Sequence, residues 1–325
     1  EQADQMESNI RKHSYEKLAG NLVREEDLAK KPKANDAVSF KDKVREKLDK
    51  GEKQNINTLR KDAKELGLKK TDTELQELAE LAVVEKSKEI SLGKGSDEDK
   101  LDKIIDVYDN QPTISMRSSE RIAKQQYSTP IPLSFIAGKY LGKEGTVLEP
   151  NAGNGAMTVY FDPKRVQVNE IDPTRLENLQ EQGFAKVTDQ DATKPLDIKP
   201  VDGLIMNPPF GSAPEKSFDG YKVKGLDEQM IINSLESLKD NGKAAIIMGG
   251  HNSYDEKGRL KADRTFFNYL YNHYNVDGVL NIDREKKKKQ GTSLPIRMIL
   301  IDGRKETPEG NAPLKKKKKK TFDDF

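Results

Sequence analysis

Cysteine is absent from this chain of 325 residues, which excludes disulfide bonds, thiol nucleophiles and zinc–thiolate sites. The three histidines, His13, His251 and His273, lack metal-ligand spacing, so no metal site is expected. No apolar run is long enough to span a membrane and no signal peptide is recognisable, so we expect a cytoplasmic location without membrane contact. The net charge is only +2 and does not by itself indicate nucleic-acid binding.

Composition divides the chain into four regions. Residues 1–54 are strongly charged with few large apolar side chains, and we interpret them as an arm or linker. Residues 55–112 carry helix caps and leucines at three-residue spacing, which predict a small helical domain. Such a hairpin can bind DNA but is more often a packing or docking unit. Residues 113–303 form the main domain, and residues 304–325 form a basic polar tail.

Predicted strands and helices alternate through the main domain. The strands are expected at residues 146–149, 165–169, 185–188, 202–206, 243–248, 276–282 and 294–301, and the last two are expected to form a hairpin. The intervening helices are expected at residues 131–141, 173–179, 226–238 and 263–274. This order predicts an open, doubly wound α/β sheet that is mostly parallel, with a terminal antiparallel pair. Ligands of such sheets lie at the carboxyl ends of the strands.

A glycine-rich turn follows the first predicted strand. Glu149 precedes Pro150-Asn151-Ala152-Gly153-Asn154-Gly155, and Ala156 is expected to open a helix. The two glycines let the backbone approach a ligand closely, although the alternative is that they only shape the turn. The turn is neither a P-loop nor Gly-x-Gly-x-x-Gly, because the required lysine and third glycine are missing. The acidic Glu149 suits a cationic or hydroxyl-bearing ligand better than a pyrophosphate.

Acidic residues end the next two predicted strands. Glu170 lies ~15–17 residues past the glycines, close to where a Rossmann-like site places the acid that binds ribose hydroxyls. Asp172 follows it, directly before a predicted helix. Asp191 ends the third strand, where Asp189 competes for the same role. The alternative for Glu170 is a surface carboxylate.

The tetrapeptide Asn207-Pro208-Pro209-Phe210 leaves the end of the fourth predicted strand. Two prolines stiffen the backbone and remove two N–H donors, and each restricts the residue before it. One amide side chain and bare carbonyls therefore stand beside the flat ring of Phe210. This arrangement suits a planar group that carries an NH2. Taken alone, the segment is more readily a turn with a core phenylalanine.

Together these motifs resemble the class I S-adenosylmethionine (SAM)-dependent methyltransferases over residues 125–303. More narrowly, they resemble the N6-adenine DNA methyltransferases whose SAM motifs precede the catalytic motif. The resemblance implies the following site residues. The cofactor contacts are Thr129, Glu149, Pro150, Asn151, Gly153, Gly155, Glu170 (ribose), Asp172, Asp191 (adenine ring) and Asn207. The catalytic residues are Asn207, Pro208, Pro209 and Phe210. Thr129 belongs to Tyr127–Pro130, which matches the segment that caps the methionine end of SAM.

The resemblance implies methyl transfer from SAM to the exocyclic amine of a flipped adenine in DNA. An RNA guanine-N2 methyltransferase can carry the same tetrapeptide and stays an alternative. A protein glutamine methyltransferase more usually has Tyr at position 210. The third alternative is an inactive SAM-fold scaffold whose helical region docks a partner.

The sequence departs from the family in its flanks. Only a short polar segment follows the last predicted strand, so a flanking domain or a partner is expected to supply target recognition. The helical hairpin is similar to segments that precede methylase modules in large phage and mobile-element proteins, and the chain begins at Glu1. We therefore expect a module of a longer protein. The basic run at residues 286–289 is expected to contact phosphates, and that at residues 315–320 to be a linker.

Overall fold

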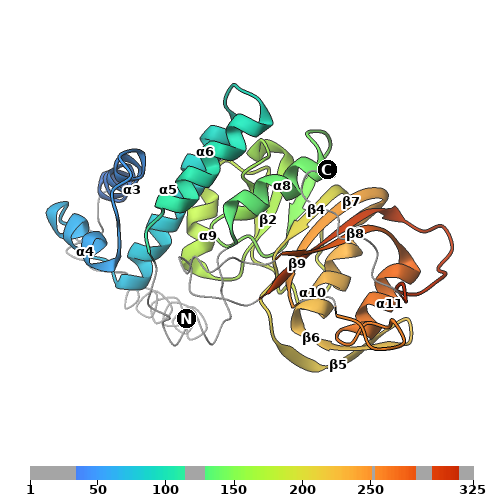
Figure 1. Cartoon of the computed structure of the whole chain (residues 1–325). Coiled ribbons are helices and arrows are strands. Elements are labelled where there is room, and N and C mark those ends of the chain that lie inside the picture. The colour runs from blue at the N-terminus through green and yellow to red at the C-terminus, as the bar shows by residue number, and fades with distance from the viewer. Residues whose placement is uncertain (1–33, 114–128, 251–252, 283–294, 315–325) are drawn as a thin grey trace, which may run out of the picture.

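The computed structural model describes residues 34–113, 129–250, 253–282 and 295–314 (Figure 1). Four helices form a region beside a sheet that is covered on both faces. Within these described ranges, no helix combines the length and the apolar character that a membrane span requires. The segment Tyr127–Ser128, both basic runs and residues 1–33 of the predicted arm lie outside the described residues.

The helical region begins inside the predicted arm. Its members are α3 (Ala34–Asp49), α4 (Ile56–Glu65), α5 (Asp72–Leu92) and α6 (Asp97–Asn110). Asn55 and Thr71 cap α4 and α5 through reciprocal side-chain bonds with the third helical residue. In α3, the fully buried Phe40 and Val44 join the core that α5 and α6 share. Residues 34–49 therefore pack with the helical region, while the other domain boundaries stay predictions.

The sheet has seven strands in the order β3-β2-β1-β4-β7-β9-β8. The strands are β1 (Val147–Glu149), β2 (Val166–Asn169), β3 (Lys186–Thr188), β4 (Val201–Met206), β7 (Leu238–Gly249), β8 (Tyr274–Ile282) and β9 (Ile296–Arg304). Pairing is parallel from β3 to β7 and antiparallel where β9 joins β7 and β8. This arrangement confirms the predicted Rossmann-like class I methyltransferase sheet, including its terminal antiparallel pair.

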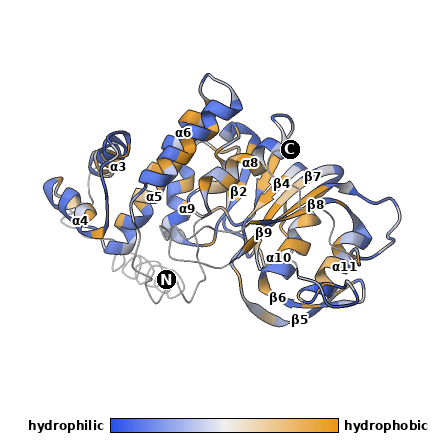
Figure 2. Ribbon diagram, viewed as in Figure 1, coloured by the Kyte–Doolittle hydropathy of each residue, from blue (hydrophilic) through white to orange (hydrophobic). Residues whose placement is uncertain are grey.

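Alternate residues of the central strands bury opposite faces of the sheet. In β7, Ala245 and Ile247 belong to one core and Ala244 and Ile246 to the other. The first core lies under α8 (Ile131–Leu141) and α9 (Pro173–Gln180), and the second under α10 (Leu226–Leu235) and α11 (Arg264–His273). Burial on both faces explains why β4, the second half of β7 and most of β9 are largely apolar (Figure 2).

A two-stranded hairpin follows the tetrapeptide, and no strand was expected there. It consists of β5 (Ser212–Phe218) and β6 (Tyr221–Gly225), which lie beyond α10 and α11 in Figure 1. Most of β5 is exposed, so its sequence lacks the apolar alternation by which strands are predicted. The turn does carry a signal, because Asp219 and Gly220 both have positive φ, as a two-residue hairpin turn requires.

The helix expected to open at Ala156 is reduced to a short 3-10 turn, η1 (Ala156–Thr158). A second such turn, η2 (Pro163–Arg165), leads into β2. The residues after η1 are Val159, Tyr160 and Phe161, which are β-branched or aromatic, then Asp162 and Pro163, so too little chain is left for an α-helix. The prediction of an α-helix here was therefore wrong.

Helix α8 packs tightly on the segment after η1, which yields a stability prediction. A Cβ added at Gly138 would lie 2.3 Å from the Cβ of the buried Tyr160. Gly138→Ala raises helix propensity, worth about 0.5–1 kcal/mol, but overpacks this contact at about 1–3 kcal/mol. We expect a net loss of about 1–2 kcal/mol in urea unfolding. The exposed Lys139→Ala is the control, and equal stability of the two variants would contradict the packing argument.

Candidate active site

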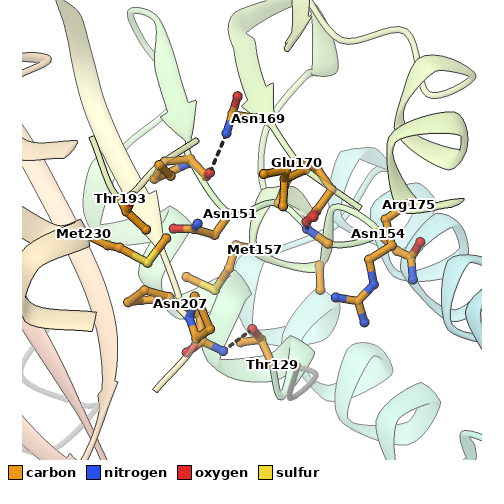
Figure 3. A pocket seen from close by; sticks show the side chains of 18 of the residues that line it. Thr129, Asn151, Asn154, Met157, Asn169, Glu170, Arg175, Thr193, Asn207 and Met230 are labelled. Atoms are coloured by element: carbon orange, nitrogen blue, oxygen red, sulfur yellow. Dashed lines mark hydrogen bonds between the residues drawn. The ribbon is translucent and has the colours of Figure 1, made fainter. Parts of the chain in front are cut away.

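A cavity of about 430 Å³ lies where the carboxyl ends of β1, β2, β3 and β4 meet (Figure 3). Its volume is within the range of small-molecule sites. The predicted site residues in its lining are Thr129, Pro150, Asn151, Gly153, Glu170, Asp191, Asn207, Pro208, Pro209 and Phe210. The parallel register of the strands therefore brings together segments that are far apart in the sequence.

Glu170 joins the ends of the two first strands. One carboxylate oxygen accepts a hydrogen bond from the Gly153 N–H at 2.8 Å, and the other accepts one from the Asp172 N–H at 2.8 Å. The side chain is buried yet lines the cavity. Each oxygen can accept a further bond, so the carboxylate can receive hydroxyl groups of a ligand while it holds the glycine turn.

Asn169 was not identified from the sequence, although it lines the cavity beside Glu170. Its amide nitrogen donates to the carbonyls of Pro150 at 3.1 Å and Gln190 at 2.9 Å, and its oxygen accepts from the Gln190 N–H at 2.8 Å. The side chain thus ties the loops after β1, β2 and β3 to one another. The sequence signal for a role of Asn169 was weak, because it consisted only of an asparagine at the end of a short predicted strand.

Asn207 and Thr129 meet on one side of the cavity (Figure 3). The Asn207 amide nitrogen donates to the Thr129 hydroxyl at 2.8 Å, which fixes the side chain. Its side-chain oxygen is buried and has no hydrogen-bond partner among the described residues. A buried unpaired acceptor costs about 1–3 kcal/mol, so this oxygen is a strong candidate to receive a ligand hydrogen.

Asp191 also borders the cavity, whereas its competitor Asp189 does not. One oxygen of Asp191 accepts from the Thr193 hydroxyl at 2.6 Å and from the Thr193 N–H at 3.0 Å. These hydrogen bonds hold the pKa of the carboxyl below its ordinary value. Asp191 is therefore an ionised acceptor in the loop after β3, at the border of the cavity.

Three predicted contacts do not line the cavity. Glu149 is fully buried and accepts from the Asn151 N–H at 2.9 Å, and burial raises its pKa well above the ordinary value. Gly155 has φ of +89°, and a Cβ there would lie 3.1 Å from the Gln182 side chain. Asp172 caps α9 through the N–H groups of Thr174 and Arg175. All three therefore stabilise the loops after β1 and β2 from outside the cavity lining.

Phe210 separates this cavity from a second one of about 570 Å³. A Cβ added at Gly249 would lie 3.3 Å from the Phe210 ring, so the bare glycine lets the ring pack against the end of β7. The second cavity is lined by groups of both signs. The basic ones are Lys222, Lys224 and Arg264, and the acidic ones are Asp227, Glu228 and Asp263. Sequence reasoning identified none of these six side chains, because their proximity depends on the β5–β6 hairpin.

Asp227 and Glu228 occupy the buried first turn of α10. Burial raises the pKa of Asp227 to about 6, and the negative charge of Asp263 adds to the effect. Burial and the same neighbour also raise the pKa of Glu228. Among the described residues, no cluster of three or more His, Cys, Asp or Glu is arranged to hold a metal ion.

The raised pKa of Asp227 predicts a pH-dependent stability. Between its ordinary value of 3.8 and about 6, the folded protein binds more protons than the unfolded chain. Stability therefore falls as the pH rises through this window. Asp227→Asn removes the ionisation, so we expect it to exceed the wild type by about 1–2 kcal/mol in urea unfolding at pH 8, with little gain at pH 4. Glu236→Gln, at the exposed end of the same helix, is the control, and a pH-independent gain would contradict the assignment.

No protein-family model and no curated protein sequence matches the chain. Among solved structures, a class I SAM-dependent methyltransferase from Listeria monocytogenes is 13% identical, with 81% of this chain and 88% of that chain covered and a TM-score of 0.46. The M protein of the type I restriction enzyme EcoKI is 14% identical, with 80% of this chain and 67% of that chain covered and a TM-score of 0.41. TrmN from Thermus thermophilus is 14% identical, with 63% of this chain and 66% of that chain covered and a TM-score of 0.38.

These likenesses are too distant to assign an activity to this chain. Its own strand order, parallel register and antiparallel edge are those of the class I methyltransferase fold. Its cavity lies at the carboxyl edge of that sheet, between the glycine turn and the Asn-Pro-Pro-Phe loop.

Proposed function

We propose that the protein transfers a methyl group from SAM to the exocyclic amine of a nucleobase, with adenine N6 in DNA as the target. The observation that carries this proposal is the buried, unpaired oxygen of Asn207. Thr129 holds the Asn207 amide from behind, and the Pro208 and Phe210 side of the loop lines the same cavity. An acceptor fixed in this way suits an N–H donor, and the ring beside it suits a planar base.

The described residues fit SAM in the first cavity. Glu170 retains acceptor capacity for the ribose hydroxyls beyond its two backbone bonds. Asp191 is held by Thr193, which lies near Met230 in the cavity lining (Figure 3), and an acceptor there suits an adenine ring with its amino group. The side chain of Ile171 is exposed yet lines this cavity, so it offers an apolar surface to a ring.

The bound cofactor supplies an electrophilic methyl group on a sulfonium. A base amine is a poor nucleophile, because its lone pair is delocalised into the ring. If the Asn207 oxygen and the Pro208 carbonyl accept its two hydrogens, the nitrogen is steered toward tetrahedral geometry and the charge that develops on it is stabilised. With SAM bound, the N–C bond would form as the S–C bond breaks, S-adenosylhomocysteine would leave, and the methylated nitrogen would release one proton to water. No covalent enzyme intermediate is needed, which agrees with a chain that has no cysteine.

The second cavity supports a nucleic-acid substrate. Phe210 lines both cavities, so a base that stacks on the ring from the second cavity has its edge next to Asn207. Lys222 and Lys224 point to the same face of β6, because successive side chains alternate along a strand. These two cations at the rim of the cavity suit the phosphates that flank a flipped nucleotide.

The Asn207 side chain provides the first functional prediction. Asn207→Ala removes an acceptor that matters most in the transition state, so kcat should fall on the order of 100-fold or more while SAM binding is retained. Labelled SAM, unmethylated genomic DNA and total RNA would be used in parallel, with nucleosides identified by mass. Asn272→Ala on α11, outside both cavities, is the control. Full activity of Asn207→Ala would refute the assignment.

The identity of the labelled nucleoside separates the candidate substrates. N6-methyladenine in DNA supports the proposal. Label on N2 of guanine in RNA would show that the alternative substrate is the true one, since that amino group can make the same two hydrogen bonds. SAM binding without label in either nucleic acid would support the scaffold function instead.

The lysines of β6 provide a prediction about salt. Each phosphate contact contributes about 0.9 to the slope of log affinity against log salt concentration. The double variant Lys222→Gln, Lys224→Gln should therefore reduce the slope of DNA binding by about 1–2. Fluorescence anisotropy with a short duplex at several salt concentrations measures it. The matched control is the double variant Lys199→Gln, Lys239→Gln, whose lysines lie at the amino ends of β4 and β7, away from both cavities. An unchanged slope in the Lys222, Lys224 variant would exclude phosphate contact by these two lysines.

A further inference from the structure

Helix α5 of the helical region reaches the first cavity. Glu80 of this helix is part of the cavity lining, together with residues of the sheet domain. Glu77 lies one turn earlier on the same face of the helix and is only 4% exposed. Helix α5 packs against α3, α4 and α6 and also contacts α9 of the sheet domain (Figure 1).

Glu77 binds two residues of the sheet domain with one carboxylate. It accepts from Arg175 Nε at 3.0 Å and Nη2 at 3.3 Å, and from the Asn154 amide nitrogen at 2.7 Å. Arg175 is also buried and lines the cavity. The charges of Glu77 and Glu80 raise the pKa of the Arg175 guanidinium against the opposing effect of its burial.

Asn154 is the residue between the two glycines of the turn. Its side-chain oxygen accepts from the Asn178 amide at 2.9 Å, and its backbone carbonyl accepts from the Gln182 amide at 3.0 Å. Lys88 of α5 donates to Gln182 at 3.0 Å. Every polar group of the Asn154 side chain is therefore held by α5 or α9, and the turn between β1 and β2 is fixed from outside the sheet.

The short η1 turn explains why this outside support matters. A full α-helix after the glycine turn would fix its backbone through the first helical hydrogen bonds. Only three residues form η1, so the turn lacks this support. A buried ion pair contributes little to stability, because the desolvation of both charges offsets their attraction. The Glu77–Arg175 pair therefore has more weight as a positioning device than as a source of stability.

We infer that α5 is a component of the cofactor site, and that Glu77 is a positioning residue that holds the glycine turn and Arg175 in the conformation that binds the cofactor. The helical region is thus part of the binding site and not a separate docking unit. This inference depends on the proposed function in one respect, namely that the ligand of the first cavity is SAM or its product.

The test measures the binding of S-adenosylhomocysteine to the full chain by calorimetry. Glu77→Gln keeps the side-chain shape but removes the charge that pairs with Arg175 and one of its acceptor oxygens. We expect affinity to fall about 10-fold, the effect of one charge-assisted hydrogen bond. The matched control is Glu85→Gln on the same helix, whose partner Lys41 lies at 2.6 Å within the helical region. Its affinity should stay within 2-fold of the wild type.

Kinetics distinguish positioning from simple destabilisation. If Glu77 positions the turn, the KM for SAM rises in Glu77→Gln while kcat at saturating SAM and the KM for DNA stay near the wild-type values. A variant that merely unfolds loses kcat in proportion to the folded fraction. Unchanged KM for SAM, or a loss confined to kcat, would overturn the inference.

Glu80→Gln keeps the inference falsifiable if Glu77→Gln does not fold, because it leaves the Glu77–Arg175 pair intact. Weaker binding of S-adenosylhomocysteine supports α5 as a wall of the site, and unchanged affinity overturns it. A wild-type chain that binds neither S-adenosylhomocysteine nor SAM would refute the proposed function together with the inference. Wild-type binding with unchanged Glu77 and Glu80 variants would refute the inference alone.

Discussion

The bidentate hold of Glu170 on two backbone N–H groups is the interaction on which the site depends. It links Gly153, after β1, to Asp172, before α9, and so fixes the two loops at the edge of the sheet. The link is possible because β1 and β2 are parallel neighbours in register, with Glu149 opposite Val168. Asn169 extends the same principle to the loop after β3. A rigid edge of this kind can present acceptors to a ligand without reorganising when the ligand arrives.

The Asn207 loop shows how the chain keeps an unsatisfied group in place. A buried amide oxygen without a partner favours any rearrangement that pairs it. The two prolines prevent the backbone from supplying an N–H, and Thr129 occupies the amide nitrogen. Gly249 completes the arrangement by letting the Phe210 ring lie against β7. Local stiffness therefore preserves a binding capacity that a more flexible loop would satisfy internally.

Sequence patterns predicted the elements whose signal is local. The apolar strands, the antiparallel pair and the position of Asn207 at a strand end follow from periodicity and proline chemistry. The β5–β6 hairpin escaped because its exposed strand has no apolar alternation. Asn169 and Glu77 escaped for another reason. Each acts through partners that only the folded topology brings close, and a buried carboxylate on a helix looks in sequence like any solvated one.

Helix α5 has a consequence for the order of folding during synthesis. Glu77 and Arg175 are 98 residues apart, and Lys88 and Gln182 are 94 apart. When the helical region leaves the ribosome, its apolar core can form, but the bonds of these side chains to Arg175 and Gln182 cannot form until that part of the chain has been made. Closing so long a loop costs chain entropy before any contact rewards it. The glycine turn is thus held by a helix that is translated well before it. Until the sheet domain has been made, the face of α5 that carries Glu77 and Lys88 lacks its contacts with that domain.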